Sequence, residues 1–433
     1  MLAAIRRWFD ENILELGREM RLSYLPPLMV YVAAGVSGLT GIVGTFFVKE
    51  YLGLSAAFLA ALGFWAGIPW ALKMPLGHLV DLMWRHKAGL VWLGASLIAA
   101  SLLIMLGLVA EPQTMRGIMP LEAWYVVAAL LSPVGYVLQD VVADAMTVEA
   151  VPRVNDHGEM VPPETRRLMN TTLQMLGRVA IIGGGVLVSL VNVVMFAGVE
   201  RLPNPERVAI YAQVYGMALV IPAISVAGVL LASLIRRREA GRLRARGFDD
   251  AAVRAMLEPP TELVKPDWWI LGGSLVFVAI SLSVGVSQLE FGQEIIFLGS
   301  FAIITFLMAK LLRALDEDSR RTLLGTAIVI FVFRAMPGPG AGSTWWMIDV
   351  LGFDQSFLAK LSLIASVLTL FGLFGFRRFM GERSIAYIVG FLALTGTLLS
   401  VPTLGMYHGL HEWTAAHTGG IVDARFIALI DTA

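Results

Sequence analysis

Residues 87–110 read KAGLVWLGASLIAASLLIMLGLVA, and no charged side chain follows Lys87 in this stretch of 24 residues. An α-helix rises about 1.5 Å per residue and the hydrocarbon core of a bilayer is about 30 Å thick, so about 20 mostly apolar residues cross it. Because lipid offers the backbone no hydrogen-bond partners, such a segment must pair its N–H and C=O groups internally, as a helix does. The stretch therefore predicts a membrane-spanning helix.

Comparable apolar segments recur along the whole chain. Eleven complete spans are expected, at residues 24–48, 56–84, 87–110, 121–148, 168–196, 209–235, 268–288, 292–313, 322–348, 356–376 and 384–402. A twelfth segment begins near Val422 and ends with the chain. A membrane β-barrel would show alternating apolar and polar residues over about ten positions, and these segments do not alternate. The chain is predicted to be an all-α polytopic membrane protein.

The composition agrees with this fold class. The chain is 57% hydrophobic and 15% charged, whereas soluble globular proteins carry about 25% charged residues. Its zero net charge gives no support to nucleic acid as a partner, and its lack of cysteine excludes disulfides and thiolate chemistry. The sequence contains no phosphate-binding loop motif, so coupling to ATP hydrolysis is not expected. Its six histidines show no metal-binding spacing. We expect a protein that is not an enzyme and that binds neither a cofactor nor a metal ion.

The basic residues of the loops predict the orientation. Alternate loops that begin with the N-terminal segment hold 24 Lys and Arg residues, and the opposite set holds four. Because Lys and Arg are retained on the cytoplasmic side, the N-terminus is expected to be cytoplasmic. We expect a monomer in the cytoplasmic (inner) membrane, with the lipid bilayer around it.

The order of the segments suggests two bundles. The expected parts are a cytoplasmic N-terminal segment (1–23), a six-helix bundle (24–235), a basic cytoplasmic linker (236–267), an extra transmembrane hairpin (268–313) and a C-terminal bundle (322–433). Weak similarity between the two bundles is typical of transporters with a site at the membrane midplane. The second bundle has fewer spans, so we expect the natural chain to continue for roughly 70–90 residues beyond Ala433.

Two aspartates lie within the expected span 121–148. Asp140 and Asp144 are four residues apart and therefore share one helix face. A charged residue within the membrane costs at least about 2.5 kcal/mol, so the two are expected to be functional or to pair with a basic residue of a neighbouring helix. In a transporter, either aspartate could be the proton-coupling group.

Four basic residues also lie within expected spans: Lys73, Arg178, Arg334 and Lys360. Cations that face a cavity would attract an anionic substrate, and arginine is suited to forked binding of carboxylates. Gln174 precedes Arg178 by four residues and lies on the same face of the helix. We therefore expect Lys73, Gln174, Arg178 and Arg334 to bind substrate, whereas Lys360 could instead extend to the membrane surface.

The stretch 77–87 resembles the cytoplasmic loop motif of the major facilitator superfamily. Gly77, Asp81 and Arg85 match this motif, although Leu82 and Trp84 replace its usual basic residue and glycine. The resemblance implies a role at the interface between domains. The alternative is an ordinary cytoplasmic turn.

A candidate gate is the run Pro337-Gly338-Pro339-Gly340, which lies within the expected span 322–348. Proline removes a backbone donor and glycine removes rigidity, so this span cannot be a straight helix. Irregular backbone at membrane depth is tolerated where it lines a cavity or is buried in protein. We therefore expect Pro337 and Gly338 to belong to a gate.

Several stretches together resemble the folate-biopterin transporter family of the major facilitator superfamily, namely residues 69–81, 139–149, 174–185 and 334–380. The resemblance implies the two-bundle fold of that superfamily and a secondary transporter that moves a folate-like or pterin-like anion, with protons, by alternating access. The extra hairpin 268–313 departs from the family pattern, and Met74 separates Lys73 from Pro75 where Lys-Pro is common.

Other functions remain open. The hairpin and the stretch 139–144 also resemble muropeptide permeases. A non-transporting membrane assembly factor could reuse the same fold, because a binding surface leaves little trace in an apolar sequence. A channel would need a ring of charged groups or carbonyls along a pore, and the two-bundle pattern speaks against it.

Overall fold

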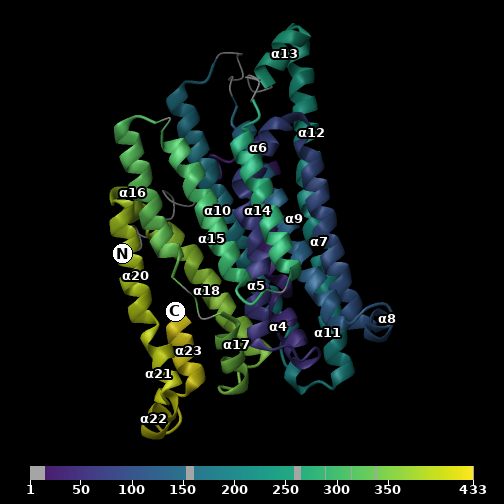
Figure 1. Cartoon of the computed structure of the whole chain (residues 1–433), viewed down its shortest axis with the longest axis vertical. Coiled ribbons are helices and arrows are strands. Elements are labelled where there is room, and N and C mark those ends of the chain that lie inside the picture. The colour runs from purple at the N-terminus through teal and green to yellow at the C-terminus, as the bar shows by residue number, and fades with distance from the viewer. Residues whose placement is uncertain are drawn as a thin grey trace. The chain divides into compact units, whose positions relative to one another are not determined.

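The computed structural model describes residues 15–152, 160–257, 265–287, 289–313, 315–336, 338 and 340–432. The regular elements in these ranges are all helices, as Figure 1 shows. Ten are long and apolar enough to cross a membrane: Leu22–Glu50, Ala56–Leu82, Lys87–Ala110, Leu121–Ala150, Pro163–Arg201, Asn204–Ala245, Trp268–Gly285, Gly292–Lys310, Gln355–Gly375 and Ile385–Tyr407. They correspond to ten of the eleven predicted spans, and the prediction of an all-α polytopic membrane protein is confirmed.

The remaining predicted span, residues 322–348, is divided in two. Helix α16 (Glu317–Arg334) ends three residues before Pro337, and α17 (Gly340–Asp349) begins at a glycine with φ of +59°. The predicted break in this segment is therefore present. Pro337 and Pro339 themselves lie outside the described residues, and Gly338 between them is exposed.

The chain divides into two compact units, the first made of residues 1–265 and 354–370. The helices of the first unit are α2 (Glu15–Arg18), η2 (Leu22–Tyr24), α3 (Leu25–Gly35), η3 (Val36–Thr40), α4 (Gly41–Glu50), α5 (Ala56–Ala71), α6 (Lys73–Leu82), η4 (Trp84–His86), α7 (Lys87–Ala110), α8 (Pro112–Arg116), α9 (Leu121–Ala150), α10 (Pro163–Met195), η5 (Val199–Arg201), α11 (Asn204–Ala218), α12 (Val220–Ala245), α13 (Asp250–Leu257) and most of α18 (Gln355–Gly375).

The second unit is made of residues 266–353 and 371–433. Its helices are α14 (Trp268–Ser287), α15 (Gly292–Leu312), α16, α17, α19 (Arg377–Glu382), α20 (Ile385–Leu399), α21 (Val401–Tyr407), α22 (Leu410–His417) and α23 (Ala424–Thr432). Helices α14 and α15 pack against each other as a hairpin, and Lys310 Nζ lies 3.8 Å from the centre of the Trp269 ring. Helix α20 packs against α16.

Two spans of the first unit are interrupted in their middle. The first changes to a short 3-10 segment, η3, between α3 and α4. The second breaks at Leu72, which separates α5 from α6. Pro75 explains this break, because it has no N–H to donate to the carbonyl of Ala71 four residues earlier. Lys73 is consequently the first residue of a helix that begins within the span.

Close approach at glycines holds the first unit together. Helix α7 packs along α9 where Gly94 faces Gly135, and a Cβ at either position would lie 2.6 Å from the carbonyl oxygen of the other. Helix α3 meets α10 in the same way, since a Cβ at Gly184 would lie 2.9 Å from the Gly35 backbone. Small residues let membrane helices come close enough for extensive van der Waals contact.

Residues 355–370 of α18 belong to the first unit, where they are bonded to α10 and α11. Ser189 of α10 lies 2.9 Å from Ser362, measured between the hydroxyl oxygens. Gln355, which is 3% exposed, donates from Nε2 to the Tyr211 hydroxyl of α11 at 2.9 Å. Residues 355–370 are thus part of the unit that residues 1–265 build.

The predicted linker 236–267 is helical over part of its length. Helix α12 continues to Ala245, because the run of Arg, Glu, Ala and Leu residues there consists of good helix formers. Gly247, with φ of +92°, follows its end, and α13 begins at Asp250. The Arg244 Nε atom lies 2.8 Å from Asp250 Oδ1 and ties the two helices.

Candidate functional site

Lys73, Asp140 and Asp144 form one cluster within the first unit. Lys73 Nζ lies 2.6 Å from Asp140 Oδ2 and 3.0 Å from Asp144 Oδ2. The two aspartates are one turn apart on α9, so one ammonium group at the start of α6 can reach both. Of the alternatives that the sequence left open, an ion pair with a neighbouring helix is therefore present. We call these three residues the charged triad.

Tyr31 of α3 joins the triad, although no sequence pattern marks it as a site residue. Its hydroxyl donates to Asp144 Oδ1 at 2.8 Å. The Thr147 hydroxyl donates to the Asp144 carbonyl at 2.7 Å, and Gln174 Nε2 lies 3.5 Å from that hydroxyl. A tyrosine in an apolar span carries no pattern that separates a site residue from a core residue. Four helices, α3, α6, α9 and α10, thus supply this polar network.

The triad carries an excess of negative charge. When all three side chains are ionised, two carboxylates share one ammonium group, which leaves a net charge of −1. The Asp140 side chain is 20% exposed, and those of Lys73 and Asp144 are 45% and 46% exposed. The excess charge is therefore not sealed in the core.

A small cavity of about 150 Å³ adjoins the triad. It is lined by Val30, Tyr31, Ala34, Ser37, Trp70, Tyr136, Gln139 and Asp140. Gln139 is only 2% exposed and accepts a hydrogen bond from the Ser225 hydroxyl at 2.9 Å, while its Nε2 has no partner among the described residues. Three aromatic rings, a carboxylate and an unsatisfied amide suit a small planar group with polar edges.

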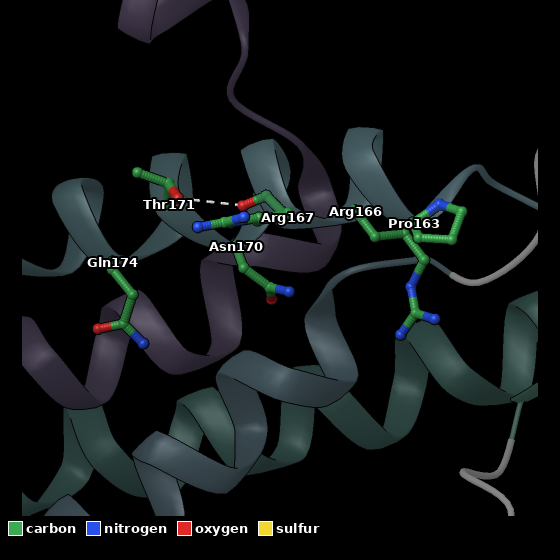
Figure 2. A pocket seen from close by; sticks show the side chains of 6 residues that line it. All are labelled: Pro163, Arg166, Arg167, Asn170, Thr171 and Gln174. Atoms are coloured by element: carbon green, nitrogen blue, oxygen red, sulfur yellow. Dashed lines mark hydrogen bonds between the residues drawn. The ribbon is translucent and has the colours of Figure 1, made fainter. Parts of the chain in front are cut away.

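A larger groove of about 470 Å³ lies along the first turns of α10, as Figure 2 shows. It is lined by Pro163, Arg166, Arg167, Asn170, Thr171 and Gln174. Arg178 follows Gln174 by one turn, is exposed, and forms no ion pair with another described residue. Of the predicted substrate-binding residues, Gln174 and Arg178 are therefore near each other, while Lys73 is held by the aspartates.

The other predicted site residues belong to α6, to the turn that follows it, or to the second unit. Arg334 is exposed at the end of α16, in the second unit. Gly77 and Asp81 are on α6, where a Cβ at Gly77 would meet no atom within 4 Å and Asp81 is exposed. The side chain of Arg85 and the whole of Pro337 lie outside the described part of the chain. The gating roles of these residues, and of Gly338, stay predictions.

A second ion-pair cluster ties three helices at the cytoplasmic ends predicted for them. Glu149 at the end of α9 accepts from Lys87 Nζ of α7 at 2.6 Å and lies 3.3 Å from Arg236 Nη2 of α12. Lys87 is 6% exposed and also lies over the Trp84 ring. Glu149 therefore neutralises a buried cation.

Comparison with known proteins adds one relative. The chain is 22% identical over 403 residues to the folate-biopterin transporter of Synechocystis sp. (strain ATCC 27184 / PCC 6803 / Kazusa). The match covers 92% of this chain and 63% of the relative, so the chain spans less than two thirds of that protein's length. No family model matches the chain, and no solved structure matches it. The likeness and the ten apolar helices together support a multi-pass membrane transporter.

Proposed function

We propose that this protein is a secondary active transporter of a small organic anion of folate-like or pterin-like chemistry, coupled to protons. We assign it to the folate-biopterin transporter family and to the two-bundle major facilitator fold. The likeness to the Synechocystis protein supports the substrate class. The charged triad is the observation that carries the mechanism.

The triad provides a direct route from protonation to substrate binding. Asp140 and Asp144 compete with an anionic substrate for the same ammonium group of Lys73. A proton on either carboxylate removes one of the two charges that hold Lys73, so the ammonium becomes available to an anion. Departure of the proton reverses the exchange. One proton and one negative charge would therefore be linked at a single cation.

Substrate would lie between the triad and α10. Gln174 of α10 connects the two regions, because its Nε2 lies 3.5 Å from the Thr147 hydroxyl of α9 and its side chain lines the groove. Arg178 supplies an unpaired guanidinium one turn further along. Arg334, at the end of α16, stays a proposed substrate-binding residue. For alternating access, we propose that Gly77, Asp81 and Arg85 form a domain-interface motif. Pro337 and Gly338 are proposed to belong to a gate.

Uptake into proteoliposomes tests this function. Purified protein is reconstituted, and entry of radiolabelled folic acid or biopterin is followed with and without an imposed pH gradient. We expect the gradient to stimulate uptake of at least one compound by the unaltered protein. In Asp144→Asn, which removes one carboxylate of the triad, the stimulation should disappear. Asp318→Asn, an exposed carboxylate in the first turn of α16, is the matched control and should behave like the unaltered protein. Stimulation that persists in Asp144→Asn and in Asp140→Asn would contradict the coupling role.

A further inference from the structure

The groove at the start of α10 contains two arginines that the proposed transport cycle has not used. Arg166 and Arg167 lie in the first two turns of a helix of 33 residues. In the sequence, both count only among the basic loop residues that predict which side of the membrane is cytoplasmic. The structure places both in the wall of a groove of about 470 Å³, together with Asn170 and Gln174. That volume is within the range of about 300–1,000 Å³ typical of sites for small organic ligands.

Spacing along α10 connects this groove with the proposed substrate site. Arg166, Asn170, Gln174 and Arg178 follow each other at intervals of four residues, so they share one side of the helix. Figure 2 shows the side chains of Arg166, Asn170 and Gln174 pointing to the same side. At about 1.5 Å per residue the row is about 18 Å long, with a guanidinium at each end.

Neither arginine of the groove has an anionic partner in the described part of the chain. Within the described residues, Arg166 and Arg167 form no ion pair, and the Arg166 Nε atom is buried without a hydrogen-bond partner. Arg236, predicted to lie on the same side of the membrane, pairs with Glu149. Buried N–H groups normally have partners, and a guanidinium fork fits the two oxygens of a carboxylate. Thr171 is excluded as a donor to such a ligand, since its hydroxyl is already bonded to the Arg167 carbonyl at 3.0 Å.

We propose that Arg166, Arg167 and Asn170 form a carboxylate-binding site at the cytoplasmic end of the substrate path, distinct from the charged triad. The inference rests on the proposed function, because it assigns the anionic end of the substrate to this site. A substrate with a carboxylate tail engages the groove, and one without a carboxylate does not. The site therefore discriminates among substrates that share the same ring system.

Folic acid and biopterin separate these two cases. Both contain a pterin ring, but only folic acid carries a glutamate tail with two carboxylates. Binding of each compound to the full-length purified protein is measured by calorimetry in nanodiscs made only of phosphatidylcholine. In Arg166→Gln/Arg167→Gln we expect about tenfold or greater loss of affinity for folic acid, because charge-assisted hydrogen bonds are lost, and no change for biopterin. Arg116→Gln, an unpaired arginine at the end of α8, is the matched control.

Each outcome decides the inference. Biopterin binding also reports whether the variant is folded, so an equal loss for both compounds overturns the carboxylate site, and so does unchanged binding of both. An anionic lipid headgroup would use the same guanidinium chemistry. If added phosphatidylglycerol weakens folic acid binding to the unaltered protein to the level of the double variant, lipid occupies the arginines and the substrate assignment is overturned. Failure of the unaltered protein to bind either compound would overturn the proposed function itself.

Discussion

The hydroxyl oxygens of Ser189 and Ser362 lie 2.9 Å apart, although 173 residues separate them in the sequence. Ser366, one turn further along α18, lies 3.3 Å from the same Ser189 hydroxyl. With the buried bond between Gln355 and Tyr211, these contacts fasten α18 to α10 and α11. The predicted C-terminal bundle (322–433) includes α18, and the predicted N-terminal bundle (24–235) includes α10 and α11. An alternating-access cycle that separates these bundles would have to break these contacts, which we call the seam.

A disulfide across this seam should stop transport. The chain has no cysteine, so the double variant Ser189→Cys/Ser362→Cys contains only the two intended thiols. Because the two hydroxyl oxygens are 2.9 Å apart, thiols at these positions would be close neighbours. We expect oxidation to abolish uptake in proteoliposomes and reduction to restore it, with neither effect in the single variants. Undiminished uptake by the cross-linked protein would show that the seam does not move.

Lys73→Met should separate a functional role of the triad from a structural one. Because Lys73 and Asp144 are nearly half exposed, the ion pairs should contribute only about 1 kcal/mol to stability. We therefore expect a small change in thermal unfolding and a nearly complete loss of uptake per folded molecule. Lys360→Met, which changes an exposed lysine of α18, serves as the control. A large loss of stability with normal uptake would assign the triad to folding alone.

Glu149→Leu should destabilise the protein by about 3 kcal/mol, because it leaves the buried Lys87 cation without its partner. The double variant Lys87→Met/Glu149→Leu replaces the pair by apolar groups of similar size and should recover most of the loss. Unfolding temperatures in detergent measure both. If the double variant is no more stable than Glu149→Leu, burial of Lys87 is not the cause.

Gly94→Ala and Gly89→Ala change the same helix with opposite expected results. A Cβ at Gly94 would lie 2.6 Å from the Gly135 carbonyl oxygen, whereas one at Gly89 would meet nothing within 4 Å. Overpacking typically costs about 1–3 kcal/mol, and alanine gains up to about 1 kcal/mol over glycine in a helix. We expect the unfolding temperature to fall in the first variant and to hold or rise in the second.

The spans could be predicted from the sequence because crossing a bilayer requires a run of apolar residues of fixed minimum length. The break between α16 and α17 was predictable too, since the prolines and glycines around 337–340 are incompatible with a straight helix. The break at Leu72 was not predicted, although Pro69 and Pro75 flank it. Residues 56–84 are apolar enough to be taken as a single continuous span.

The site was predictable in its charges but not in its pairing. Asp140, Asp144 and Lys73 stand out because charged residues are costly in a membrane. Which cation faces the aspartates depends on how α6 packs against α9. Lys73 and Asp140 are 67 positions apart, so no local pattern encodes this packing. Tyr31 and Gln139 are ordinary members of apolar segments until the packing is known. Loop arginines and site arginines look alike in a sequence, so Arg166 and Arg167 count there only among the basic residues that predict the orientation.

The interruption at Leu72 has a mechanical consequence. Since Pro75 has no amide hydrogen, the Ala71 carbonyl lacks a helical partner whatever the angle between α5 and α6. The segment can therefore act as a hinge, at which α6 tilts without losing that backbone hydrogen bond. Because Lys73 is the first residue beyond the hinge, a tilt of α6 moves the ammonium group toward or away from both aspartates. A change in the charge of the triad would therefore change the angle between α5 and α6.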